Sequence, residues 1–115
     1  MATFSKIVLS ASTDGRGVLV VATATAGTTI HTAHASAEDE IWLYAYNSHT
    51  APITLTLEMG GATDPNDHIV STIAYDAGVI EVVPGFILTN SLVLKAFASV
   101  ASKVTLFGFV NRITA

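Results

Sequence analysis

Residues 39–61 read DEIWLYAYNSHTAPITLTLEMGG and contain two different strand patterns. Residues 53–59 (ITLTLEM) alternate apolar and polar side chains, which is typical of a β-strand with one buried face. Residues 41–46 (IWLYAY) instead carry apolar side chains on both alternating sets. Because successive side chains of a strand point to opposite faces, this segment predicts a buried face and an aromatic outer face.

The composition predicts one small domain whose surface is short of charge. The chain has 115 residues, of which 12% are charged, about half the usual share of soluble domains. We expect a single domain over residues 1–115, in which residues 1–12 are a candidate extended N-terminal arm. Sparse charge favours burial of part of the exterior against other chains. A neutral surface rich in Thr and Ser is the alternative.

Charge and hydropathy exclude several classes of partner. A formal net charge of −4 and only five scattered Lys and Arg argue against nucleic acid. The longest uncharged run, residues 17–37, is rich in Thr, Gly and His and does not resemble a membrane-spanning helix. The N-terminus lacks the pattern of a signal peptide, so we expect cytoplasmic synthesis without export. The absence of cysteine excludes disulfides and thiolate metal sites.

Period-two alternation and frequent Gly, Asn, Asp and Pro breaks predict an all-β chain of about eight or nine short strands. The expected strands are residues 4–10, 17–25, 28–35, 40–47, 52–59, 68–74, 79–83, 91–98 and 103–112. Regularly spaced turns between short strands predict an antiparallel β-sandwich, jelly-roll-like in arrangement. Asp14-Gly15 predicts a hairpin turn, and Pro84-Gly85 predicts a break between strands.

One side of the expected strands is apolar and is predicted to fill the core. These residues are Ile7, Leu9, Val18, Val20, Ile41, Leu43, Ile53, Leu55, Leu57, Leu92, Leu94, Val104 and Leu106. Three strands also carry aromatic rings on the opposite side, which we interpret as an interface with another subunit or with a capsid. The candidate interface residues are Trp42, Tyr44, Tyr46, Phe97, Phe107 and Phe109. The alternative is that a loop or the N-terminal arm covers these rings within one chain.

The four histidines do not predict a metal site. His31 and His34 are expected on opposite faces of one strand, while His49 and His68 fall in distant turns, so all four are interpreted as surface residues. Residues 64–67 (DPND) offer oxygen ligands but lack the calcium-loop arrangement, so they predict a turn.

No pattern in the sequence predicts catalysis or a cofactor. The acidic cluster at residues 38–40 (EDE) is expected to be solvated, because a pair of catalytic carboxylates would require a cleft. A nucleophile elbow and a phosphate-binding glycine loop are both missing. We therefore expect a protein that is not an enzyme, with no catalytic, cofactor-binding or metal-binding residues.

Three segments carry a resemblance to a known kind of protein: residues 41–61, residues 82–99 (VVPGFILTNSLVLKAFAS) and residues 103–113 (KVTLFGFVNRI). Over residues 40–112 the chain resembles small all-β bacteriophage virion proteins, which occur as head decoration (cement) subunits or as tail and fibre components. The resemblance implies a homotrimer on the capsid exterior that clamps neighbouring major capsid proteins. It implies no catalytic residues.

The expected function is therefore that of a capsid decoration subunit that is made in the host cytoplasm and located in the virion. Its expected partners are other copies of itself and the major capsid protein, with neither nucleic acid nor membrane. One alternative is a tail, adaptor or fibre-base subunit. The other is a carbohydrate-binding β-sandwich in which Trp42, Tyr44 and Tyr46 stack on sugar rings.

Overall fold

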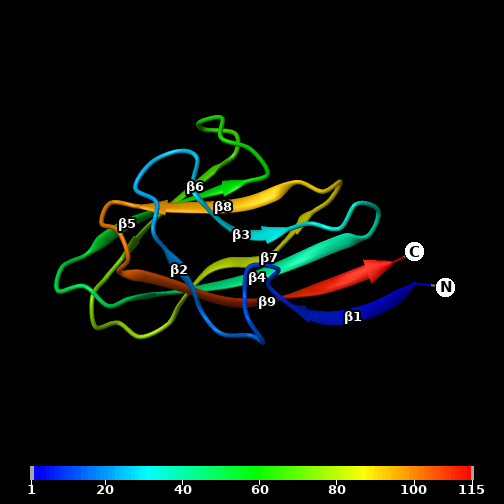
Figure 1. The fold of residues 1–115 in the computed structure, drawn as a ribbon, viewed down its shortest axis with the longest axis horizontal. Helices are drawn as coiled ribbons and strands as arrows, with labels where there is room; N and C mark the ends of the chain where they lie inside the picture. Colours follow the sequence, from blue (N-terminus) through cyan, green and yellow to red (C-terminus); the bar gives the residue numbers. More distant parts are fainter. Residues whose placement is uncertain (1, 115) are drawn as a thin grey trace.

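A computed structural model describes residues 2–114, so Met1 and Ala115 lie outside the described part of the chain. It contains nine strands in two antiparallel sheets that pack face to face (Figure 1). Sheet A comprises β1 (Thr3–Val8), β2 (Val18–Val20), β4 (Glu38–Asn47), β7 (Ile80–Leu88) and β9 (Val104–Thr114). Sheet B comprises β3 (Thr28–Thr32), β5 (Ile53–Met59), β6 (His68–Ile73) and β8 (Val93–Ala98). The predicted all-β antiparallel sandwich is confirmed.

The strand order is that of a jelly roll. Sheet A runs β1-β9-β4-β7 and sheet B runs β3-β8-β5-β6, with β2 also paired to β9. Most consecutive strands of the chain therefore lie in different sheets, and all neighbours within a sheet except β5 and β6 come from distant parts of the sequence. Closing the sandwich in this way places one face of each sheet in the core and leaves the other outside.

The first strand of the jelly roll is interrupted. Both β1 and β2 pair antiparallel with β9, β1 with its last six residues and β2 with its first three. Asp14 and Gly15 adopt positive φ, and the Arg16 N–H bonds the Thr13 carbonyl at 3.0 Å, so the predicted tight turn is present. The predicted hairpin is wrong, because the strands on either side of this turn, β1 and β2, do not pair with each other. Both pair with β9 instead. The expected strand at 17–25 shortens to β2, after which the chain crosses to sheet B.

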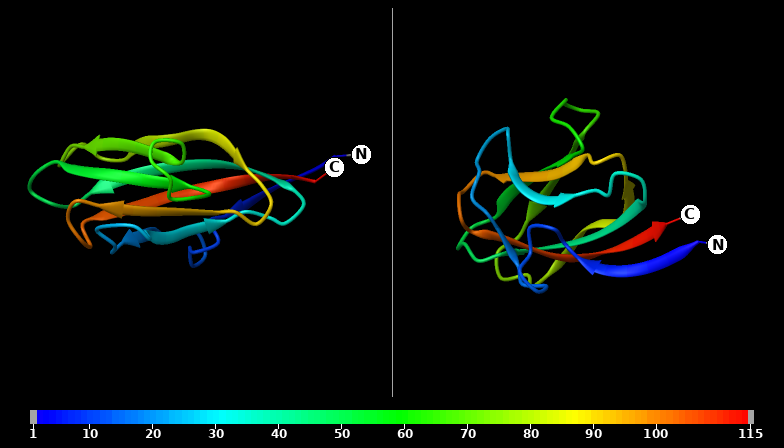
Figure 2. Two further views of the ribbon diagram at one scale, coloured as in Figure 1. Left: turned by 90° about the horizontal axis from the view of Figure 1, so that it is seen from above. Right: turned by 45° about the vertical axis from the view of Figure 1, so that its right-hand side comes forward.

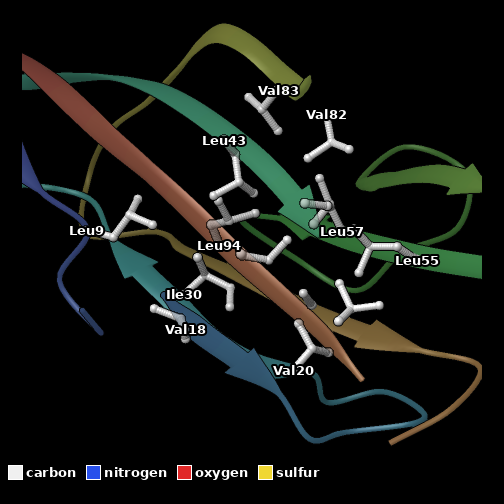
Figure 3. Packing of buried hydrophobic residues seen from close by; sticks show 14 of the residues in the cluster. Leu9, Val18, Val20, Ile30, Leu43, Leu55, Leu57, Val82, Val83 and Leu94 are labelled. Carbon is white, nitrogen blue, oxygen red and sulfur yellow. The ribbon is translucent and has the colours of Figure 1, made fainter. Parts of the chain in front are cut away.

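The core is formed by the inner faces of both sheets (Figure 3). Eleven of the thirteen predicted core residues are buried, and Ile7 packs against the core as a partly buried side chain. The prediction that Leu92 belongs to the core is wrong, since this residue is 44% exposed. Asn90 and Ser91 turn the chain with positive φ, and the Leu92 N–H bonds the Thr89 carbonyl, so β8 begins only at Val93.

The Pro84-Gly85 pair lies inside β7 instead of ending it. In the register between β4 and β7, Ile41 opposes Phe86 and Trp42 opposes Pro84, so Gly85 is an unpaired bulge residue. Pro84 has no backbone N–H to donate to the sheet, which is tolerated because β7 is an edge strand. The predicted strand break at this position is therefore wrong, and β7 continues to Leu88.

Gly85→Ala is expected to destabilise the fold by about 2 kcal/mol, because φ there is +86° and left-handed backbone costs an L-residue about 1–2 kcal/mol. A Cβ would also lie 2.8 Å from the Trp42 ring. Gly78→Ala is the matched control, since its φ is +72° but nothing lies within 4 Å. Chemical denaturation followed by Trp42 fluorescence measures both variants. Equal losses would show that contact with the indole does not constrain position 85.

Candidate functional site

Five of the six predicted interface rings lie together on the outer face of sheet A. Across β4 and β9, Trp42 opposes Phe109 and Tyr44 opposes Phe107, with Tyr46 next along β4. The Trp42 and Phe109 rings stack with centroids 6.2 Å apart and an angle of 11° between their planes. The rings therefore form a continuous aromatic patch along the two central strands of the sheet.

Phe97 does not belong to this patch. It projects from β8 on the outer face of sheet B, where it opposes Thr56 of β5. Its ring meets His68 edge-on, with centroids 6.1 Å apart. The six predicted residues thus divide between the two outer faces of the sandwich.

The structure adds apolar side chains to the aromatic patch that sequence reasoning missed. They are Phe4 (73% exposed), Val8 (46%), Leu19 (44%) and Ile87 (52%), which come from β1, β2 and β7. Their positions opposite outward residues of β9 and β4 place them on the same face. The signal that would have predicted them is strand geometry, because period two places Phe4 and Val8 on the side opposite the predicted core residue Ile7.

The area of this face is comparable with half of an ordinary protein interface. Four neighbouring strands about 4.8 Å apart, each extended over up to the 11 residues of β9, cover about 700 Å². Stable protein interfaces bury about 800 Å² per partner. The outer face of sheet A is thus large enough to hold a subunit contact.

The face is shielded only at its margins. The Lys6 ammonium lies 4.9 Å above the centre of the Phe109 ring, and Gly17 packs closely against Phe107. Even so, Tyr46 and Phe107 remain 38% and 37% exposed. The predicted N-terminal arm does not fold over the rings, because its residues from Thr3 to Val8 form edge strand β1 (Figure 2); Met1 of that arm lies outside the described residues.

Glu40 orients the indole at one end of the patch. Its Oε1 accepts hydrogen bonds from Trp42 Nε1 at 2.7 Å and from Asn111 Nδ2 at 3.0 Å. These two hydrogen bonds hold the pKa of the Glu40 carboxyl below its usual value, so Glu40 is ionised at neutral pH. Beside it lies a recess of about 410 Å³ lined by Phe4, Ser5, Lys6, Glu40, Asn111 and Ile113.

Asp39 is fully buried and forms the centre of a polar network. Arg112 donates from Nε to Oδ1 at 2.7 Å and from Nη2 to Oδ2 at 2.9 Å. His31 Nε2 lies 2.7 Å from Oδ2, and the His34 N–H adds a bond of 3.2 Å. Burial acts to raise the pKa of Asp39, but the hydrogen bonds from Arg112 and His31 outweigh it and lower the pKa to about 2. The expectation that the cluster at 38–40 is solvated is therefore wrong for Asp39.

His31 is also fully buried, which contradicts its interpretation as a surface residue. The Ser10 N–H donates to Nδ1 at 3.0 Å, so the ring proton is on Nε2 and is donated to Asp39. The Ser10 hydroxyl oxygen accepts from the Thr32 N–H. Both ring nitrogens of His31 are hydrogen-bonded, and the Ser10 hydroxyl is directed to the backbone of Thr32 and not to the ring. Ser10, His31 and Asp39 therefore do not form a nucleophile–base arrangement. The network instead fastens the chain after β1 to β3 and β4.

A second buried carboxylate, Glu58, fastens the connection between β2 and β3. Its Oε1 accepts from the Gly27 N–H at 2.7 Å, and its Oε2 accepts from the Thr25 hydroxyl. His68 Nε2 lies 4.0 Å from Oε2. An adjoining cavity of about 270 Å³ is lined in part by Glu58 and Lys95. Both oxygens of Glu58 are thus held by donors of its own chain.

The remaining candidate ligands stabilise turns. His34 Nδ1 accepts from the Ala37 N–H at 2.9 Å. The segment 64–67 closes on Thr63, whose N–H bonds Asp67 Oδ2 at 3.1 Å. Within residues 2–114, no three His, Cys, Asp or Glu side chains are grouped so that they would hold a metal ion. Residues 2–114 also contain no helix with the length and hydropathy needed to span a membrane.

The fold and these contacts define a jelly-roll β-sandwich protein with an aromatic outer face and two buried carboxylates. No protein-family model, curated protein or solved structure matches the chain. Its function is therefore inferred from its own residues.

Because the pKa of Asp39 is lowered on folding, the free energy of unfolding is expected to decrease as the pH falls. A carboxyl whose pKa falls from its ordinary value of 3.8 to about 2 on folding contributes about 2 kcal/mol above pH 4. This contribution is lost as the pH falls from about 4 to about 2. We expect the unfolding free energies of the wild type and Asp39→Asn to converge over that interval, as measured by urea denaturation.

Asp76→Asn is the control, because Asp76 is exposed and its φ of +60° suits Asn equally. It should retain the pH dependence of the wild type. A wild-type stability that runs parallel to that of Asp39→Asn from pH 5 to pH 2 would contradict the proposed ion-pair geometry.

Proposed function

We propose that this protein is a non-enzymatic structural subunit that decorates a bacteriophage capsid as a homotrimer and binds the lattice of the major capsid protein. The observation that supports this function is the unpartnered aromatic patch of Trp42, Tyr44, Tyr46, Phe107 and Phe109 on the outer face of sheet A. The virion setting is supplied by the resemblance of residues 40–112 to small phage virion proteins.

Aromatic side chains grouped on the outer face of a sheet are suited to protein contact. Trp and Tyr are the residues that most often dominate interface energetics, because their rings bury a large area at little cost in side-chain entropy. Trp42 is held in place by stacking on Phe109 and by its bond to Glu40. A ring already ordered in the free subunit loses less freedom when a partner covers it.

A decoration protein acts by linkage and avidity. A subunit that binds the assembled lattice, and not the dissociated capsid protein, shifts the equilibrium toward the assembled state. Contacts of modest strength become effective when a symmetric oligomer makes several at once. This role requires interaction surfaces and no reactive site. In agreement with it, both buried carboxylates, Asp39 and Glu58, are bound by donors of their own chain.

Tyr44→Lys tests the subunit interface. Tyr44 is a half-buried residue at the middle of the patch, so a lysine there would place a charge in the contact and weaken self-association at least about tenfold, or about 1.4 kcal/mol. Sedimentation equilibrium measures the effect. Val70→Lys is the control, because Val70 is a 61% exposed strand residue on sheet B. Val70→Lys should assemble as the wild type does. A Tyr44→Lys protein with unchanged assembly would assign the contact to another surface.

The virion assignment has its own test. Antibody labelling of purified phage particles should place the chain on the outside of the head. Label on the tail would favour the tail, adaptor or fibre-base alternative. A particle that lacks the chain would contradict both structural roles.

A carbohydrate-binding function is the second candidate, because the ring platform is partly open to solvent and carries Glu40 and Asn111 beside Trp42. Trp42 is the only tryptophan, so its fluorescence reports on this face. Under the proposed function, acrylamide quenching of Trp42 decreases as protein concentration rises through the dissociation constant, and added glycans leave it unchanged. Concentration-independent quenching that a glycan suppresses would favour the carbohydrate-binding candidate.

A further inference from the structure

Sheet edge β1 is open, whereas the edge strands β7, β3 and β6 are obstructed or tied. Edge strand β7 contains Pro84 and the Gly85 bulge. Edge strand β3 has a register shift near Ile30, whose carbonyl accepts from the Ala11 N–H. Edge strand β6 is tied at the Ile73 carbonyl by Asn47 Nδ2. Native sheets use proline and bulges in edge strands to prevent pairing with a further strand, whereas the tie on β6 occupies only its last carbonyl.

Strand β1 carries none of these features. It pairs with β9 from Thr3↔Thr114 to Val8↔Phe109 without a register shift. Among residues 2–114, its backbone groups make no hydrogen bond outside this ladder. Five of its six residues are exposed, and the strand lies at the lower right margin of the molecule in Figure 1 and in the right-hand view of Figure 2. The N–H and C=O groups on its free edge are therefore available to another strand.

The single charge of β1 does not block its edge. Lysine on an edge strand commonly discourages pairing. Here the Lys6 ammonium is directed over the Phe109 ring of the neighbouring strand, 4.9 Å from its centre. It lies on the outer face of its own sheet and away from the free backbone edge.

We propose that β1 pairs antiparallel with β1 of a second copy of this chain, about a two-fold axis centred on Ser5, so that two A sheets join into one. In a two-fold contact, the free N–H and C=O groups of β1 in each copy bond to the C=O and N–H groups of the same strand in the other copy. With the axis perpendicular to the sheet, the aromatic outer faces lie on the same side. Phe4 and Val8, both exposed on that face, then line the junction.

Like charges and the length of β1 together favour one register of the proposed β1–β1 pairing. A centre at Lys6 would set two residues of like charge directly opposite each other, which is destabilising. A centre at Ile7 would extend pairing past Val8, where β1 ends. A centre at Phe4 would leave Ile7 and Val8 unpaired. The Ser5 centre pairs Phe4 with Lys6 of the other copy and Thr3 with Ile7, so no like charges are opposed.

This contact goes beyond the proposed function and does not depend on it. It uses backbone atoms of the sheet edge and leaves the rings of the aromatic patch free for another subunit or a capsid. A two-fold contact through the edge would be additional to the threefold contacts of a trimer.

Disulfide trapping tests the register, because the chain has no cysteine of its own. In the proposed pairing, the two copies of position 5 lie directly opposite each other, with Cα atoms about 4.5–5.5 Å apart, so the thiols of Ser5→Cys are within disulfide range. Thr3→Cys is the matched control on the same strand and face, because the two copies of position 3 would lie about 14 Å apart. We expect Ser5→Cys to form covalent dimers at least about tenfold faster than Thr3→Cys, as seen by non-reducing electrophoresis.

Equal trapping rates for Ser5→Cys and Thr3→Cys would reflect collision alone and would overturn the proposal. Both substitutions are at exposed positions, and circular dichroism checks that the fold is retained. The same experiment in a Tyr44→Lys background separates this contact from the aromatic patch. Trapping that persists there supports an independent edge contact, and trapping that disappears overturns it even where Tyr44→Lys alone weakens assembly.

Discussion

The antiparallel pairing of β4 with β9 is the constraint on which the remaining structure depends. Ten residue pairs, from Glu38↔Ile113 to Asn47↔Val104, are in register without a shift. Residues opposite each other on neighbouring strands share a face, so one register places Leu43 in the core and the aromatic rings outside. A slip of one residue would exchange the two faces. The core and the outer patch are thus two consequences of one pairing.

The close approach of these strands is supported by Gly108, where a Cβ would lie 2.1 Å from the Trp42 carbonyl oxygen. The buried charges have a different role. A buried carboxylate is costly unless it is paired and hydrogen-bonded, and replacing such a pair by apolar groups is often neutral or stabilising. Besides the pH-dependent stability that Asp39 contributes, Asp39 and Glu58 therefore specify where the connections lie. Each carboxylate binds a segment distant in sequence.

The case for association depends on what the surface is made of and not on how much of it there is. The chain exposes 6006 Å², close to the value of about 6000 Å² that a folded monomer of 12.0 kDa has. The sandwich is therefore as closed as that of an independent protein. What distinguishes it is that aromatic rings and an open edge strand occur on one sheet. A single sheet would thus present both a face and an edge to its partners.

The sequence by itself determined the all-β class, most of the core and the outward direction of the rings on β4 and β9, because alternation along a strand is a local property. Only the tertiary structure decided that Phe97 lies on the other sheet, that Pro84 continues a strand and that Asp39 is buried against His31 and Arg112. These features depend on which strands become neighbours and which become edges. That choice is made by pairing between residues far apart in the chain, and no local pattern records it.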